Sequence, residues 1–147
     1  MSDAATASAA AATAPWWVRP GLDVDPDGRL RIAGRDAEAL AREHGTPLFV
    51  YDEAHLRHRC REAVDAFGDG VAYASKAFLC VAMARLAHEE GMHIDVATGG
   101  ELHVALAAGV PADRLVLHGN NKSPEELREA RAAGIGRIVI DSFDELD

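Results

Sequence analysis

Short apolar runs recur along most of this chain at an almost constant interval. They lie at residues 48–51, 71–74, 93–96, 115–118 and 137–140, and their apolar anchors are 22 or 23 residues apart. Runs of this length that are rich in β-branched residues predict buried strands, with room for one helix in each interval. The repeat therefore predicts parallel strands with right-handed helical crossovers, in an α/β barrel or a doubly wound sheet. The near-constant period favours the barrel.

Helix signals fill the intervals between these runs. Apolar residues between 56 and 67 recur at spacings of three and four, typical of a helix with one face on a sheet. A later helix is predicted from Ser123, its N-cap, with a capping-box glutamate, to Gly134. Ahead of the repeat, Asp36 and Gly45 mark the start and end of another helix.

The length limits how much of a barrel this chain can form. It has 147 residues, whereas a closed eight-stranded barrel typically needs about 250. We therefore expect residues 46–147 to form the first five β/α units of a truncated barrel, ending as a sixth helix begins at 143–146. Residues 1–15 are expected to be a disordered, Ala-rich tail. Residues 16–45, with a turn-rich stretch and a short strand at 30–32, lead into the barrel.

Composition and charge narrow the class of partner. The net charge is −9 and no basic patch is evident, so we expect a small-molecule partner, with no nucleic acid and no membrane. The first fifteen residues contain no Lys or Arg and no long apolar core, which argues against a secretory signal or membrane span and favours a cytoplasmic location. The spacing of His and Cys residues predicts no metal site.

Polar residues follow several of the predicted strands, where the chemistry of a barrel gathers. Lys76 follows the second run, so we expect its amine to face the barrel mouth, where a partly desolvated lysine suits attack on an aldehyde cofactor. On position alone, however, a lysine that is solvated or paired with a carboxylate is more common. After the fourth run, Asn120, Asn121 and Lys122 are expected to shape a loop or bind ligand, with Lys122 a solvated charge.

Three ordered motifs resemble those of the fold-type III pyridoxal-phosphate decarboxylases. Residues 73–78, Tyr-Ala-Ser-Lys-Ala-Phe, resemble the family's cofactor-lysine motif, and residues 95–102 resemble its second block. Residues 118–123, His-Gly-Asn-Asn-Lys-Ser, resemble a third block, which is typical of the diaminopimelate decarboxylase branch. The resemblance implies a partial TIM barrel of the alanine racemase-like type. It also implies that residues 16–45 join a separate β domain and that the full-length protein is a homodimer.

The resemblance also implies roles for individual residues. Lys76 would hold pyridoxal 5'-phosphate covalently and act as the catalytic residue, and Ala74 would lie beside the cofactor in the same motif. Asp95 and Glu101 match acidic positions near the cofactor, and His118 lies at the same rim. Structural alternatives stay open: Asp95 as a helix cap, Glu101 as a first-turn glutamate favoured by the helix dipole, and His118 as a packing group.

The activity implied is decarboxylation of meso-2,6-diaminopimelate to L-lysine and carbon dioxide, the last step of lysine biosynthesis. The residues that would bind the phosphate, the pyridine nitrogen and the substrate are expected beyond residue 147, so this chain should be inactive alone. Alternatives are another enzyme of the same fold type (an arginine, ornithine or carboxynorspermidine decarboxylase, or an alanine racemase) or a non-catalytic pyridoxal-phosphate carrier. A fragment without function of its own also stays open.

Overall fold

A computed structural model describes residues 21–146 of the chain, which divide into two compact units between Leu56 and Arg57. Each unit is considered by itself. The expected disordered tail at 1–15 and the tryptophans Trp16 and Trp17 lie outside the described residues.

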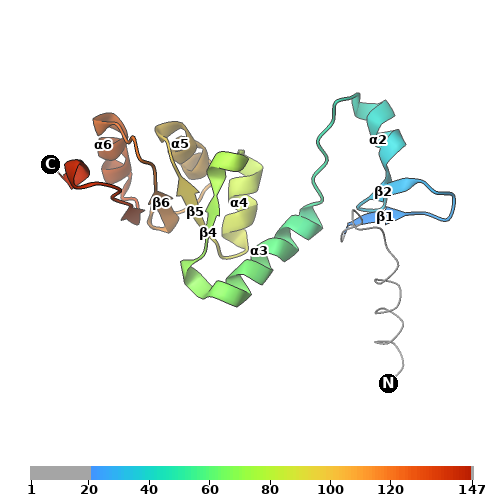
Figure 1. The fold of residues 1–147 in the computed structure, drawn as a ribbon, viewed down its shortest axis with the longest axis horizontal. Coiled ribbons are helices and arrows are strands. Elements are labelled where there is room, and N and C mark those ends of the chain that lie inside the picture. Colours follow the sequence, from blue (N-terminus) through green and yellow to red (C-terminus); the bar gives the residue numbers. More distant parts are fainter. Residues whose placement is uncertain (1–20, 147) are drawn as a thin grey trace, which may run out of the picture. The chain divides into compact units, whose positions relative to one another are not determined.

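In its described residues the first unit contains a small antiparallel sheet followed by a helix (Figure 1). Its strands, in the order β1-β2-β3, are β1 (Leu22–Val24), β2 (Leu30–Ile32) and β3 (Arg35–Asp36). Helix α2 (Ala37–His44) follows directly, with the Asp36 side chain accepting a hydrogen bond from Ala39 N and Gly45 ending the helix at φ 81°. The predicted strand at 30–32 and the predicted helix between Asp36 and Gly45 are confirmed.

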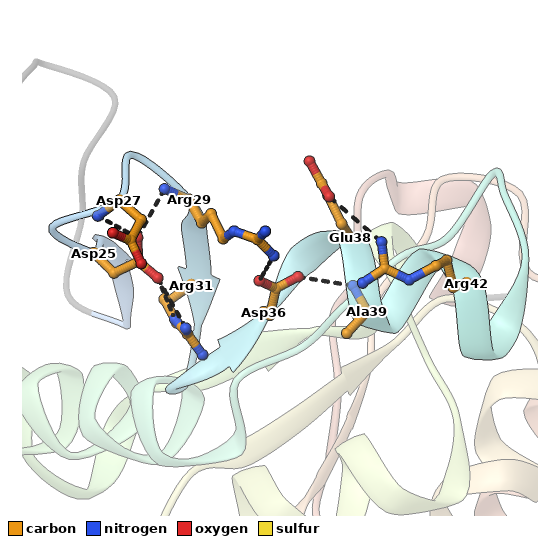
Figure 2. A network of polar contacts seen from close by, with 8 residues as sticks. All are labelled: Asp25, Asp27, Arg29, Arg31, Asp36, Glu38, Ala39 and Arg42. Atoms are coloured by element: carbon orange, nitrogen blue, oxygen red, sulfur yellow. Dashed lines mark hydrogen bonds and ion pairs between the residues drawn. The ribbon is translucent and has the colours of Figure 1, made fainter.

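A carboxylate closes the turn between β1 and β2 (Figure 2). One oxygen of Asp25 accepts from the amides of Asp27 (3.1 Å) and Arg29 (2.9 Å), and the other pairs with the Arg31 guanidinium at 2.8 Å. The Arg29 amide, and then Arg31, hold the pKa of Asp25 below its ordinary value. Arg29 also reaches Asp36 at 3.4 Å, so the same network joins the turn to the start of α2.

The predicted strand at residues 48–51 is wrong. These residues form no strand in the described part of the chain, and their side chains are exposed, Phe49 by 85%. Apolar β-branched residues favour a strand only where a neighbouring strand accepts and donates the backbone hydrogen bonds. Neither sheet of the described residues includes this segment. Asp52, which follows it, instead accepts from the amide of His55 in the first turn of α3 (Glu53–Phe67).

The second unit contains a parallel sheet whose strand order equals the chain order, β4-β5-β6-β7 (Figure 1). These strands are β4 (Ala72–Ala74), β5 (His93–Val96), β6 (Leu115–Leu117) and β7 (Arg137–Ile138), joined by α4 (Val81–Glu89), α5 (Gly99–Ala107) and α6 (Pro124–Ala133). Right-handed crossovers between successive strands place every connecting helix on one face. A doubly wound sheet would reverse its strand order, so the arrangement is that of a barrel segment, as predicted.

The core of this unit lies between the sheet and its helices. Ile94, Val96, Leu115 and Leu117 are completely buried, as are small residues such as Ala105 of α5. Side chains alternate along a strand, so these four point toward the helices and Asp95 points to the opposite face. Full burial of each large side chain contributes about 1.5–3 kcal/mol. The helices thereby fix which face of the sheet carries the polar residues.

Helix α6 has the ends that the sequence predicts. Ser123 caps it in a capping box with Glu126, and Gly134 ends it in the left-handed region at φ 76°. At residues 143–146, where a sixth helix is predicted to begin, the chain forms a 3-10 turn, η4. None of the helices in the described part of the chain is long and apolar enough to cross a membrane.

Candidate active site

The carboxyl ends of the parallel strands bring four predicted site residues close together. In the register of the sheet, Ala74 lies beside Asp95, and Asp95 lies beside Val116. Asp95 points away from the helices, so its neighbours in register do too. Lys76 and His118 follow just beyond the ends of β4 and β6, and both line the cavity that also contains Asp95.

Lys76 lies on a short 3-10 turn, η2 (Ser75–Ala77), directly after β4. The Phe78 amide donates to the carbonyl of Ser75 at 3.1 Å and closes the turn. The Tyr73 hydroxyl donates to the carbonyl of Phe78 at 2.6 Å, across the whole turn. Ser75 is 1% exposed, which anchors the turn on the sheet while Lys76 remains exposed.

A cavity of about 480 Å³ lies at these strand ends. The volume is within the range of small-molecule and cofactor sites. Four strand ends contribute to its wall, and the lining residues are Lys76, Asp95, Ala97, His118, Gly119, Asn120 and Asp141. The structure thus brings the predicted residues Lys76, Asp95 and His118 together, and it adds Asp141.

His118 lies between two carboxylates in this cavity. Its Nδ1 is 3.6 Å from Oδ2 of Asp95 and its Nε2 is 3.9 Å from Oδ1 of Asp141. These distances allow attraction to a protonated imidazole but exceed those of good hydrogen bonds. The other oxygen of Asp95, Oδ1, is buried and has no hydrogen-bond partner among the described residues. A buried acceptor of this kind is costly unless a donor reaches it.

Lys122 is not the solvated charge that the sequence suggests. Its side chain is 0% exposed, with Nζ at 3.0 Å from Oε1 of Glu145 and 3.7 Å from Oδ2 of Asp141. The ammonium also donates to the carbonyl of Gly119. The Asp141 amide, and then Lys122, hold the pKa of Glu145 below its ordinary value. The sequence does set this position apart in one respect. Of the fifteen lysines and arginines in the chain, only Lys76 and Lys122 are lysines.

The remaining two predicted residues lie outside the lining of the cavity. Ala74 is at the end of β4, beside Asp95 in the sheet. Glu101 completes the capping box of α5, where its Oε2 accepts from the amides of Ala97 and Thr98. This geometry gives Glu101 a defined structural role. A contact of Ala74 or Glu101 with a cofactor stays a prediction.

The chemistry of the site is that of an amine, two carboxylates and an imidazole. Among residues 21–146 no three His, Cys, Asp or Glu residues form a group that could hold a metal ion. A primary amine at the edge of a cofactor-sized cavity is the group that captures an aldehyde.

Residues 53–147 match the family model of the pyridoxal-dependent decarboxylases, in their pyridoxal binding domain. The chain belongs to the pyridoxal-dependent decarboxylases. Within this decarboxylase family, two similar curated proteins are the diaminopimelate decarboxylases of Mycobacterium tuberculosis and Bacillus subtilis. The first is 55% identical over 125 residues, 84% of this chain and 28% of that protein. The second is 54% identical over 124 residues, 81% of this chain and 28% of that protein.

A solved diaminopimelate decarboxylase from M. jannaschii, in complex with L-lysine, has a similar fold. Its TM-score is 0.76 at 36% identity, over 85% of this chain and 31% of that one. The chain spans 28% of the length of the two curated decarboxylases above.

The cavity residues fit the pyridoxal cofactor of the family to which the chain belongs. Lys76 supplies the primary amine that the aldehyde of pyridoxal phosphate requires, and it lines the same cavity as Asp95. Oδ1 of Asp95, which has no hydrogen-bond partner among residues 21–146, offers a buried acceptor to a donor entering that cavity.

Proposed function

We propose that the full-length protein decarboxylates meso-2,6-diaminopimelate to L-lysine and carbon dioxide, with pyridoxal 5'-phosphate held at Lys76. The observation that carries the proposal is one cavity at the strand ends that contains the Lys76 amine and the unsatisfied oxygen of Asp95. Relatives at 54–55% identity that are named diaminopimelate decarboxylase support the choice of substrate.

The residues of this chain have distinct tasks in that proposal. Pyridoxal phosphate, when bound, draws electrons from the carbon that loses carbon dioxide. Lys76 holds the cofactor through its amine and afterwards moves a proton at Nζ. Asp95 accepts a hydrogen bond at Oδ1 from a donor in the cavity, and its Oδ2 orients His118 through Nδ1. His118 forms part of the cavity wall, and its side chain is half exposed.

Further parts of the proposal concern the surroundings of the site. Ala74 and Glu101 lie near the cofactor as motif residues, and residues 16–45 contribute to a separate β domain ahead of the barrel units at 46–147. The protein is a homodimer in the cytoplasm, with a small amino acid as substrate and without nucleic acid as a partner. The net charge of −9 supports the last point.

The direct test supplies the full-length protein and pyridoxal phosphate with meso-diaminopimelate. We expect lysine and carbon dioxide in equal amounts, and we expect ornithine and arginine to be poor substrates. Lys76→Ala should lower the rate by more than about a thousandfold, because it removes the group that holds the cofactor and moves the proton. Turnover of ornithine or arginine without lysine formation from diaminopimelate would contradict the proposed substrate.

A further inference from the structure

We propose that Lys122 is a positioning residue of the cofactor cavity: its buried ammonium joins Gly119 to Asp141 and thereby fixes His118 against Asp95, beside Lys76. This inference rests on the proposed function, since it concerns the cofactor that Lys76 would hold. Lys122 does not line the cavity itself, so it acts through its neighbours.

The contacts of Lys122 connect two loops at the carboxyl end of the sheet. The carbonyl of Gly119 belongs to the loop after β6, and the carboxylates of Asp141 and Glu145 belong to the segment after β7. A second bond strengthens the β7 side, where the Asp141 amide donates to Oε2 of Glu145 at 3.0 Å. A lysine with a buried side chain needs such partners, because an unpaired ammonium is strongly destabilised away from water.

Both loops that Lys122 joins contribute to the wall of the cavity. Gly119 and Asp141 line it, and His118 directly precedes Gly119 with its Nε2 3.9 Å from Asp141. Gly119 packs closely against the chain after β5, since a Cβ there would lie 3.2 Å from the carbonyl oxygen of Ala97. A substitution of Lys122 should therefore change the positions of His118 and Asp141.

The choice of lysine at this position is itself informative. The other basic residues of the chain, apart from Lys76 and the histidines, are arginines. An ammonium is compact and can face three oxygens at once, whereas a guanidinium is planar and larger. The enclosed space between Gly119, Asp141 and Glu145 suits the smaller cation. Arginine would keep the charge but displace the loop that carries His118.

The test must separate positioning from the stability of a buried ion pair. Lys122→Met alone leaves Glu145 without its cation, so the main variant is Lys122→Met with Glu145→Gln, which removes both charges. Lys122→Arg keeps the charge and changes the geometry. Arg128→Met is the matched control, because Arg128 pairs with Glu125 on the exposed surface of α6, where its side chain is 71% exposed. All variants are made in the full-length protein.

Two quantities are measured for each variant: the urea midpoint of unfolding, and the Kd of pyridoxal phosphate added to cofactor-free protein. We expect the double variant and Lys122→Arg to unfold near the wild-type midpoint but to bind the cofactor at least about tenfold more weakly. Arg128→Met should match wild type in both. If the double variant does not fold, the Kd of Lys122→Arg compared with that of wild type tests the inference.

A folded variant at position 122 that binds pyridoxal phosphate with the wild-type Kd would overturn the inference. The proposed function is tested by a separate outcome. If wild type binds pyridoxal phosphate at Lys76 but forms no lysine from diaminopimelate, the proposed substrate is wrong, while the comparison of Kd values still tests Lys122. If wild type does not bind the cofactor at all, both proposals fail.

Discussion

At the scale of single residues, contacts across the sheet give the two lysines of this chain opposite surroundings. Lys76 is exposed at the edge of the cavity on a turn closed by Tyr73 and Phe78. Lys122 is enclosed among oxygens of Gly119, Asp141 and Glu145. An exposed amine is available to an aldehyde, and an enclosed ammonium is not. Only Lys76 is therefore positioned to react.

Gly136 is a residue whose substitution should destabilise the second unit. A Cβ at this position would lie 2.1 Å from the carbonyl oxygen of Asp113, a backbone atom that cannot turn aside. The Gly136 amide also donates to Ala112 at 2.9 Å, which holds the two segments together. We expect Gly136→Ala to lower the free energy of unfolding by about 1–3 kcal/mol or more, measured by urea denaturation.

Gly70 is the matched control for this prediction. It has nothing within 4 Å of the position of a Cβ, and its φ is not in the left-handed region. Gly70→Ala should therefore leave the free energy of unfolding unchanged or raise it by up to about 1 kcal/mol. Equal stability of Gly136→Ala and Gly70→Ala would contradict the close approach of Gly136 to Asp113.

Some of the site residues could be predicted because their placement depends only on local rules. Lys76, Asp95 and His118 come together because each lies at or just beyond the end of a parallel strand, and such ends meet at one edge of a sheet. The burial of Lys122 could not be predicted in this way. It depends on Asp141 and Glu145, which follow the next strand, and loop geometry decides whether they reach it.

At the scale of secondary-structure elements, the helices α5 and α6 are joined at their amino-terminal ends. Glu126 of α6 accepts from the amide of Ser123 (2.9 Å) within its own cap and from the amide of Gly99 (2.9 Å) at the start of α5. One carboxylate thus caps one helix and orients the next.

Glu126 should make stability depend on pH in the acid range. The amides of Ser123 and then Gly99 hold its pKa below the ordinary value. The stabilisation is therefore complete above the pKa of glutamate in the unfolded chain, about 4.3, and it is lost as the pH falls through the lower folded value. Glu126→Gln should cost about 1 kcal/mol at neutral pH and show less of this acid loss, measured by urea unfolding at several pH values.

Glu125 provides the control in the same helical turn. Its carboxylate is 72% exposed and pairs with Arg128 on the surface. Glu125→Gln should change the free energy of unfolding by less than about 0.5 kcal/mol. If Glu125→Gln and Glu126→Gln have the same stability and the same pH dependence, the bridge between α5 and α6 does not stabilise the fold.

The elements of the second unit were predictable where the sequence carries its own start and stop signals. Ser123 and Gly134 bound α6 as predicted, and β5 lies at residues 93–96, where the apolar run predicted it. The run at 48–51 is equally apolar, yet it forms no strand in the described part of the chain. A strand requires a partner, and the sequence of the run does not say whether one is present.

At the scale of the whole molecule, the order of the strands links fold to function. Sequential parallel strands keep the helices on one face and leave the polar ends of β4, β5, β6 and β7 around one cavity. The period of the sequence predicts this arrangement, because a constant step implies the same crossover each time. The chain spans 28% of the length of its curated relatives, so catalysis is a property to be tested in the full-length protein.

The most direct test of the central claim reduces the full-length protein with borohydride in the presence of pyridoxal phosphate and maps the labelled peptide. Within this chain the map has only two lysines to distinguish, Lys76 and Lys122. The exposed amine at the cavity predicts label on Lys76 and none on Lys122, and loss of that label in Lys76→Ala. Label on Lys122, or on a lysine elsewhere in the protein with Lys76 unmodified, would contradict the account.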